Sequence, residues 1–301
     1  MSVRVLMFGT TGQVAREVIR QATGHDVVLT ALSRAEADLS DPETCARRVA
    51  EHRPDLVILA AAYTAVDLAE TEGVMARRVN AEAPGAIARA CASAGAALVH
   101  FSTDFVFDGS KGAPYLADDA TNPLNAYGET KLEGERKVLD ACPRAVVIRT
   151  SWVVSAHGKN FVKTMLRLAA GGQPLKVVDD QLGRPTSAAD LAGFVLSQAR
   201  RFVDAPCGDP AFGMHHFANG GDITSWRGFA QAIFAQALGD RAPEVGATTT
   251  ADWPSPAVRP LYSALDTSAT EAVFGVRIRP WREAVTEIVA ELQSQPEATP
   301  A

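Results

Sequence analysis

Cysteine is scarce in this 301-residue sequence, and its four copies lie far apart. Cys45, Cys91, Cys142 and Cys207 form no CxxC pair and no mixed cluster with histidine. This pattern excludes a zinc site of the usual spacing and gives no sign of a disulfide framework. Because free thiols persist in the reducing cytosol, we expect a cytoplasmic protein.

Long hydrophobic runs and excess positive charge are also missing. No stretch approaches the ~18 apolar residues of a membrane-spanning helix, and Met1–Phe8 leads into a glycine turn without the apolar segment of an export signal. The formal net charge of −6 argues against nucleic-acid or acidic-membrane partners, which are met by basic surfaces. An anionic small ligand stays compatible with this balance, because arginines can gather locally.

No period of 20 to 50 residues repeats, which excludes a solenoid. Instead, short apolar runs alternate with helical segments over the first 150 residues. Strands are expected at Val3–Phe8, Asp26–Leu32, Asp55–Ala62, Ala97–Thr103 and Arg144–Thr150, and helices at Gly12–Gln21, Val74–Ala94 with a break near Pro84, and Asn125–Ala141. This alternation predicts the α/β class, with a doubly wound parallel sheet of the Rossmann type.

The first expected strand ends in a glycine turn, GTTGQVA, at Gly9–Ala15. Gly9 and Gly12 let the backbone approach a pyrophosphate, and the helix that follows offers unpaired N–H groups. Ala15 stands where related turns usually carry a third glycine. The turn therefore predicts a dinucleotide site, although glycine also simply ends strands.

The end of the second expected strand bears on the choice of cofactor. At this point of a dinucleotide fold an acid binds the ribose 2′-hydroxyl of NAD, whereas an arginine accommodates the 2′-phosphate of NADP. Here Ser33 and Arg34 follow the strand, with no acid at its tip. We expect NADPH as cofactor, with NADH as the alternative.

After Thr150 the alternation loosens. Residues 1–150 are expected to form an NAD(P)-binding domain and 151–301 mainly a smaller C-terminal α/β substrate domain, from which a helix at 187–203 returns to the sheet. The expected elements there are helices at Asn160–Ala170, Ser187–Arg201, Ser225–Leu238 and Pro280–Leu292, a strand at Leu175–Asp179 and a short strand near His215–Ala218. The tail, 295–301, is expected to be frayed.

A tyrosine and a lysine four residues apart carry the candidate chemistry. On a helix, Tyr127 and Lys131 project from one face, so that the ammonium can lie near the phenol and lower its pKa towards working pH. Thr103 ends the fourth expected strand and can face the same crevice. A hydroxyl that holds a carbonyl oxygen, a phenol that protonates it and an ammonium that tunes the phenol together predict carbonyl reduction.

Eight sequence blocks in register give a family resemblance from about Val3 to beyond Asp266. They are GTTGQV, AAYTAVDLAE, FSTDFVFDG, PLNAYGETKLEGE, RTSWV, GKNFVKTMLRLA, DDQLGRPT and PAVRPLYSALDT. The sequence resembles the extended short-chain dehydrogenase/reductases and, within them, the dTDP-4-dehydrorhamnose reductase family. The resemblance implies NAD(P)H-dependent reduction of the C4 keto group of dTDP-4-dehydro-L-rhamnose to dTDP-L-rhamnose, a precursor of cell-surface polysaccharide.

The resemblance also implies roles for individual residues. With Gly9 and Arg34 from the motifs above, the expected cofactor residues are Gly12, Gln13 and Val14 at the pyrophosphate, Asp38 and Leu39 at the adenine, Ala62, Tyr63 and Thr64 in the middle, and Phe101, Tyr127 and Lys131 at the nicotinamide end. The expected substrate residues are Thr103, Asp104, Trp152, Asn160, Arg184 and Arg259. For the arginines there is an independent argument, because a guanidinium matches a pyrophosphate with paired hydrogen bonds.

Some members of the family bind magnesium between subunits through carboxylates. Glu17, Asp190 and Glu291 are the candidates here, but acids on helices are mostly solvated, and no metal is predicted. The expected partner is the dTDP-linked keto sugar, and the resemblance allows a homodimer.

Two other functions fit the same fold. A sugar-nucleotide epimerase or another 4-keto reductase would share most of these residues, but a 4,6-dehydratase needs a proton-transferring acid after Asp104, where this sequence has Phe105. A non-catalytic regulatory subunit, like the branch of the family that serves methionine adenosyltransferase, is less compatible with an intact set of Thr103, Tyr127 and Lys131.

Overall fold

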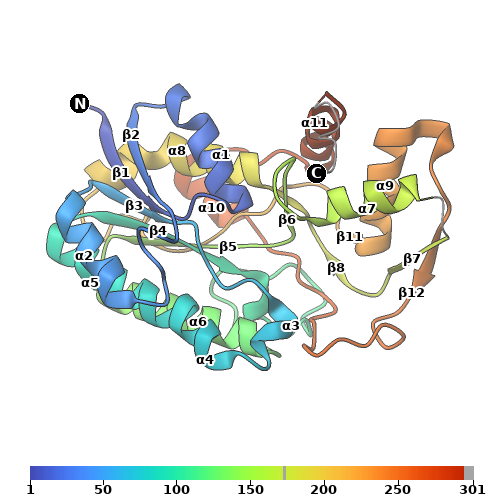
Figure 1. Ribbon diagram of the computed structural model, residues 1–301, viewed down its shortest axis with the longest axis horizontal. Coiled ribbons are helices and arrows are strands. Elements are labelled where there is room, and N and C mark those ends of the chain that lie inside the picture. The colour runs from blue at the N-terminus through green and yellow to red at the C-terminus, as the bar shows by residue number, and fades with distance from the viewer. Residues whose placement is uncertain (172–173, 295–301) are drawn as a thin grey trace.

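A six-stranded parallel sheet forms the centre of the larger part of the protein (Figure 1). The computed structural model describes residues 1–171 and 174–294, so that the tail expected to fray lies outside the described residues. The strand order is β10-β5-β4-β3-β1-β2, with all neighbours parallel. The strands are β1 (Val3–Phe8), β2 (Val27–Leu32), β3 (Leu56–Leu59), β4 (Ala97–Thr103), β5 (Ala145–Thr150) and β10 (Gly213–His216). The predicted fold class is confirmed.

The central strands β3, β4 and β5 are buried on both faces of the sheet, which explains why they are mostly apolar runs, whereas the edge strand β2 alternates between partly buried and exposed residues. Successive side chains point to opposite faces, and the two hydrophobic clusters follow that period. In β1, Val5 and Met7 belong to one cluster and Leu6 and Phe8 to the other.

Helices cover each face of the sheet (Figure 1). The helices α1 (Gln13–Gln21), α8 (Ala188–Asp204) and α10 (Ser268–Phe274) pack on one face, and α2 (Pro42–His52), α5 (Ala83–Ala94) and α6 (Ala126–Ala141) on the other. The starts of two helices follow sequence signals. Asp41 Oδ1 accepts from the Thr44 N–H at 3.1 Å and Pro42 opens α2, while Asn125 accepts from the Gly128 N–H at 2.8 Å and caps α6.

The helical segment predicted at Val74–Ala94 is broken earlier than expected. After α3 (Val66–Ala69) and α4 (Gly73–Arg77), the chain forms a π-helical turn over Arg78–Glu82 before α5 begins. Pro84 has no N–H for the carbonyl of Asn80, which a regular α-helix would bond, so the ladder changes its register one turn before the proline. The predicted break near Pro84 is thus present, and it places Asn80 in the widened turn.

The C-terminal part has its own small sheets and its own hydrophobic cluster. Its strand pairs are β6 (Val153–Val154) with β9 (Thr186–Ser187), β7 (Leu175–Val178) with β12 (Val245–Thr248), and β8 (Leu182–Gly183) with β11 (Thr224–Ser225). The helices α7 (Phe161–Ala170), α9 (Trp226–Leu238) and α11 (Trp281–Ser294) supply most of the cluster. Short 3₁₀ turns lie at Ala22–Gly24, Asp104–Val106 and Gly239–Arg241.

The strand order identifies where a ligand should bind. From β1 the chain first adds β2 on one side and then crosses to add β3 on the other, which makes the β1/β3 boundary the topological switch point. Open α/β sheets bind ligands at the carboxyl ends of the strands there. Over the described stretches of chain, no helix is long and apolar enough to cross a bilayer.

Candidate active site

A cavity of about 1270 Å³ opens at the carboxyl edge of the sheet. Typical small-molecule pockets have volumes of about 300–1,000 Å³, so this one has room for a dinucleotide and a second ligand. The predicted site residues that line it are Gly9, Gly12, Gln13, Val14, Arg34, Asp38, Leu39, Ala62, Tyr63, Thr64, Phe101, Thr103, Asp104, Tyr127, Lys131 and Trp152. Asn160, Arg184 and Arg259 are not among the lining residues.

The glycine turn after β1 has the conformation that its sequence predicts. Gly9 has φ +103°, where side chains are strained, and a Cβ there would lie 3.0 Å from the Ala61 Cβ. Gly12 stands at the N-cap of α1 without a side-chain cap, which leaves the first N–H groups of the helix free for an anion. Ala15, where a third glycine was usual, is fully buried in the core, so its methyl group is accommodated.

The end of β2 carries an acid that the sequence analysis overlooked. The Glu36 carboxylate folds back and accepts from the N–H of Ser33 at 2.8 Å and from its hydroxyl at 2.6 Å. Arg34 is highly exposed, and its Nε donates to Asp38 Oδ2 at 2.9 Å. The backbone N–H of Ser40 lowers the Asp38 pKa further than Arg34 does. Glu36 was missed because the residues directly after the strand are Ser33 and Arg34, and Glu36 reaches the strand end only by folding back onto Ser33.

Behind β3, a buried asparagine holds the cavity wall in place. Asn80 Oδ1 accepts from the Tyr63 N–H at 2.9 Å, and Asn80 Nδ2 donates to the Tyr63 carbonyl at 3.0 Å and to Thr130 Oγ1 at 3.2 Å. The Tyr63 hydroxyl donates to Glu72 at 2.8 Å. Asn80 thereby joins the π turn, the end of β3 and α6. The sequence could have pointed to Asn80 only as a polar residue within an alanine-rich helical segment.

Thr103, Tyr127 and Lys131 all line the cavity, and their catalytic roles stay predictions. Thr103 ends β4, and the Tyr127 hydroxyl is hydrogen-bonded to it. Lys131 is buried, and its Nζ donates to the Phe101 carbonyl at 2.6 Å. Phe105 packs edge-on against the Tyr127 ring, with centroids 5.6 Å apart.

The predicted pKa of the phenol is wrong in direction. Desolvation raises the pKa of Tyr127 to about 12, and the Thr103 hydrogen bond offsets this only in part. Desolvation also lowers the pKa of Lys131 to about 8, against the opposing effect of Glu135. The phenol is therefore fully protonated at neutral pH, which suits a proton donor rather than a base.

A buried ion pair lies one turn beyond Lys131. Glu135 accepts from Arg149 Nε at 2.9 Å and Nη2 at 2.8 Å, and from the Ser102 hydroxyl at 2.5 Å. Both charged side chains are almost completely buried. Since Ser102 and Arg149 belong to β4 and β5, the pair fixes α6 to the strands that carry Thr103. The sequence analysis missed it, because nothing local connects residues 14 positions apart.

Asp104 is the one buried carboxylate at the cavity wall. Its Oδ1 accepts from Thr103 Oγ1 at 3.1 Å, and an interaction with the Ser263 hydroxyl also favours its charged form. Burial raises its pKa to about 6.

Two stacked indoles form the C-terminal wall. Trp152 has φ +47°, an uncommon conformation for a bulky residue. Its ring stacks on Trp226 with centroids 3.7 Å apart, and Trp226 Nε1 donates to Gln181 Oε1 at 3.1 Å. A Cβ at Gly183 would lie 2.8 Å from the Trp152 ring, so glycine makes room for it. Trp226 also lines the cavity and was missed, because it starts an ordinary apolar helix.

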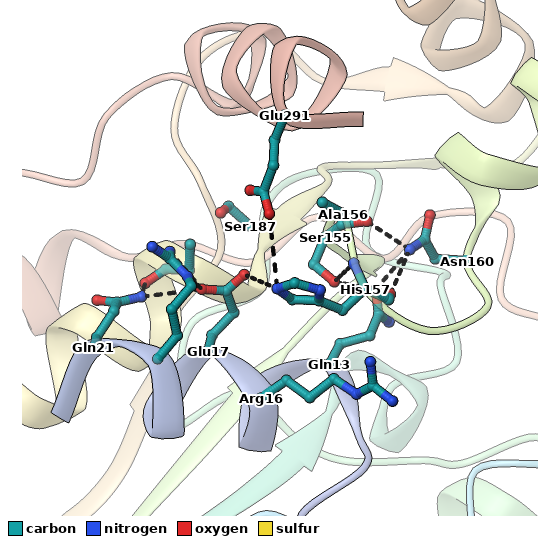
Figure 2. Close-up of polar contacts among 12 residues, drawn as sticks. Gln13, Arg16, Glu17, Gln21, Ser155, Ala156, His157, Asn160, Ser187 and Glu291 are labelled. Atoms are coloured by element: carbon teal, nitrogen blue, oxygen red, sulfur yellow. Dashed lines mark hydrogen bonds and ion pairs between the residues drawn. The ribbon is translucent and has the colours of Figure 1, made fainter. Parts of the chain in front are cut away.

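The three remaining predicted substrate residues have other neighbours. Asn160 is held within the loop before α7 and donates to Gln13 Oε1 at 3.0 Å (Figure 2). Arg259 forms a paired ion bridge with Asp67, at 3.0 and 2.8 Å. The Nε of Arg184 is buried without a partner. Their substrate roles stay predictions.

The candidate magnesium residues do not form a metal site. Asp190 accepts from Arg279 and from Asn219, and Glu17 accepts from Arg20. Glu291 lies 3.8 Å from His157 Nε2, and within residues 1–171 and 174–294 no group of three His, Cys, Asp or Glu side chains is arranged to hold a metal ion.

Comparison with known proteins agrees with the geometry. The family model of the RmlD substrate binding domain matches residues 3–294. The chain is 43% identical over 300 residues to the dTDP-4-dehydrorhamnose reductase of Burkholderia thailandensis, covering 97% of this chain and 100% of that one. It is 39% identical to the enzyme of the same name from Salmonella typhimurium, covering 96% and 98%.

Solved structures with the same description superpose closely. A dTDP-4-dehydrorhamnose reductase from Clostridium acetobutylicum has a TM-score of 0.89 at 37% identity, covering 96% of this chain and 99% of that one. Another from Bacillus anthracis, in complex with NADP, has a TM-score of 0.89 at 31% identity, covering 97% and 100%. The chain belongs to the dTDP-4-dehydrorhamnose reductase family.

Proposed function

We propose that the protein reduces the C4 keto group of dTDP-4-dehydro-L-rhamnose to dTDP-L-rhamnose with NADPH. The observation that carries this proposal is the meeting of Thr103, Tyr127 and Lys131 at the edge of a cavity with a free helix N-terminus. Family membership supports the choice of substrate, because the relatives are named dTDP-4-dehydrorhamnose reductases.

The cavity fits a dinucleotide. The uncapped N-terminus of α1 and the close approach at Gly9 suit the pyrophosphate, and the wall formed by Ala60–Thr64 suits the middle of the cofactor. Arg34 is exposed at the end of β2, where a 2′-phosphate would lie. The Bacillus anthracis relative binds NADP. Bound there, the reduced nicotinamide supplies the hydride.

The chain's own residues manage the charge that the hydride creates. As negative charge grows on the C4 oxygen, the Thr103 hydroxyl holds that oxygen and the Tyr127 phenol gives it a proton. The phenolate left behind is offset by the Lys131 ammonium, which is charged below pH about 8. An alkoxide is far more basic than a phenolate, so a phenol of pKa about 12 still donates readily.

The packing of Phe105 favours reduction over dehydration. Removal of a sugar C5 proton needs a base beside Asp104, and Phe105 instead supports the face of Tyr127. This cavity wall supplies a proton donor and no second acid in that position.

The two parts of the chain have separate proposed tasks. Residues 1–150, with α8 returned to their core, bind the cofactor, and the C-terminal residues bind the nucleotide sugar. The separate hydrophobic clusters on the two sides of the cavity support this division.

Isotope transfer tests the proposed reaction. With dTDP-4-dehydro-L-rhamnose and NADPH deuterated at nicotinamide C4, deuterium should appear at C4 of rhamnose, with one cofactor oxidised per product. Label at C5 or C6, or turnover without net oxidation, would refute the reductase.

Tyr127→Phe should lower kcat by roughly 10²- to 10⁴-fold and leave NADPH affinity little changed.

A further inference from the structure

The side chain of Gln13 points away from the cofactor turn that contains it. Its Nε2 donates to the Val153 carbonyl at 3.0 Å, and its Oε1 accepts from Ser155 Oγ at 3.1 Å and from Asn160 Nδ2 at 3.0 Å. Figure 2 shows this amide between α1 and the loop before α7. All three bonds are partly buried and join segments about 140 residues apart in sequence.

The contacted segment, residues 152–160, is part of the cavity wall. It begins at Trp152, and Gly158 and Lys159 near its end also line the cavity. Asn160 closes the loop on itself, because its Nδ2 donates to the carbonyls of Ser155 at 2.7 Å and His157 at 3.1 Å. Its Oδ1 accepts from the Lys163 N–H and caps α7. Gln13 therefore attaches a closed, capped loop to the first turn of α1.

A second contact from α1 strengthens the attachment. Glu17 lies one turn after Gln13 on the same face of the helix, and its Oε1 is 3.5 Å from His157 Nε2 (Figure 2). By contrast, Gln21, another turn along, donates to the Ala189 carbonyl at 2.9 Å and, over a longer distance of 3.4 Å, to Glu17 Oε2. The polar contacts described here between α1 and residues 152–160 come from Gln13 and Glu17, in the first two turns of the helix.

We propose that Gln13 is a positioning residue that couples the cofactor turn to the substrate wall. This inference rests on the proposed function. A cofactor bound at the first turn of α1 holds Gln13, the Gln13 amide holds residues 152–160, and the sugar then meets a Trp152 wall that is already ordered. By linkage, each ligand must tighten the binding of the other by the same factor.

Gln13→Met tests the coupling, because methionine has nearly the shape of glutamine but none of its hydrogen bonds. Gln21→Met is the control on the same helix, since it removes an amide-to-carbonyl bond and a long contact with Glu17 but leaves all three bonds of Gln13 in place. The Kd of dTDP-L-rhamnose is measured by calorimetry with and without saturating NADP⁺. We expect NADP⁺ to tighten binding at least fivefold in the wild type and in Gln21→Met, but less than twofold in Gln13→Met.

Steady-state kinetics and melting temperature give independent readouts. Gln13→Met should raise the KM for the keto sugar about tenfold, with kcat within about threefold, and both variants should lower Tm by similar amounts. Ser155→Ala should reproduce part of the KM effect. The inference is overturned if the wild type shows no coupling, if Gln13→Met keeps it, or if Gln21→Met loses it equally. Failure of the proposed function is distinct, because the wild type itself would then neither oxidise NADPH nor bind dTDP-L-rhamnose.

Discussion

Desolvation is the main cause of the shifted pKa values of Tyr127 and Lys131. Burial keeps the Tyr127 phenol protonated and weakens the hold of Lys131 on its proton, because water stabilises the charged forms of both. The ammonium that was expected to lower the pKa of the phenol instead donates to the Phe101 carbonyl. Lys131, with a pKa of about 8, and Asp104, with a pKa of about 6, are thus two groups of the cavity wall that titrate near working pH.

The Lys131 pKa of about 8 predicts a loss of activity in mild alkali. Below that pH the ammonium is charged and can offset a phenolate, so kcat/KM for NADPH should fall tenfold per unit as pH rises above about 8.

The effect of the same group on stability has the opposite sign. Between about 8 and the ordinary 10.5, the unfolded chain binds this proton more tightly, so the Lys131 contribution to the free energy of unfolding rises with pH.

A pH–rate profile with Lys131→Arg checks the assignment. Arginine stays charged throughout, so the variant should be slower but should lose the alkaline limb near pH 8. An unchanged limb in that variant would assign the titration to another group.

Arg34 and Glu36 make opposing contributions at the adenosine end. Arg34→Ala should weaken NADPH binding by about 1.5–3 kcal/mol, as for a hydrogen bond to a charged group, and should leave NADH almost unchanged. Glu36→Gln is the companion variant and should favour NADPH, since it removes a negative charge beside Ser33. Fluorescence titration gives the Kd of NADPH and of NADH for each variant and so tests both predictions. Equal losses for the two cofactors in Arg34→Ala would show that the arginine only supports the loop through Asp38.

At the scale of elements, α6 is placed by close backbone contacts as much as by its apolar face. A Cβ at Gly134 would lie 2.0 Å from the Asn80 carbonyl oxygen, and one at Gly128 would lie 2.3 Å from the Phe105 carbonyl oxygen. Since Gly128 follows Tyr127 directly, the helix that carries the phenol lies against the π turn and the end of β4. The position of Tyr127 therefore depends on these glycines.

Gly134→Ala should destabilise the protein, although alanine is the better helix former. Overpacking against a fixed carbonyl costs about 1–3 kcal/mol, more than the gain in helix propensity of up to about 1 kcal/mol. Urea unfolding should show the difference. Gly73→Ala on α4, where the added Cβ meets nothing within 4 Å, is the control and should not lower stability. Equal stability of the two variants would mean that α6 can move away from Asn80.

The same elements show what the sequence could predict. The bounds of β1 and β4 follow from apolar runs closed by a glycine and by a polar pair, and both were predicted to the residue. β3 ends at Leu59 and not at Ala62, because Ala60–Ala62 turn over Gly9 to line the cavity. Pairing of β10 with β5 joins residues more than 60 positions apart, and no local pattern specifies such a partner. The trio on β4 and α6 was predictable from spacing, whereas Asn80, Glu135 and Trp226 depend on contacts that only the folded chain makes.

At the scale of the whole molecule, two groups of polar contacts are among those that join the first 150 residues to the C-terminal part. One is the attachment of residues 152–160 to α1. The other lies at the opposite end, where Arg259 pairs with Asp67 of α3 and Asn125 Nδ2 donates to the Val258 carbonyl at 2.7 Å. Arg259, which was predicted to bind the nucleotide, is thus engaged in one of these contacts.

Arg259 can bind a pyrophosphate only if its guanidinium gives up its hydrogen bonds to Asp67 or divides its N–H groups between Asp67 and the ligand. The pair is partly exposed, with 25% of the arginine side chain and 45% of the aspartate accessible, so releasing it should cost no more than about 1 kcal/mol. Asp67→Asn should therefore tighten dTDP binding by up to about fivefold, and Arg259→Met should weaken it by tenfold or more. Asp222→Asn is the control for net charge, because it breaks a more exposed ion pair, with Arg282, outside the cavity lining. Calorimetric titration with dTDP separates the outcomes: tighter binding in Asp67→Asn alone identifies a competitor for Arg259, whereas weaker binding there would mean that Asp67 orients the guanidinium towards the nucleotide.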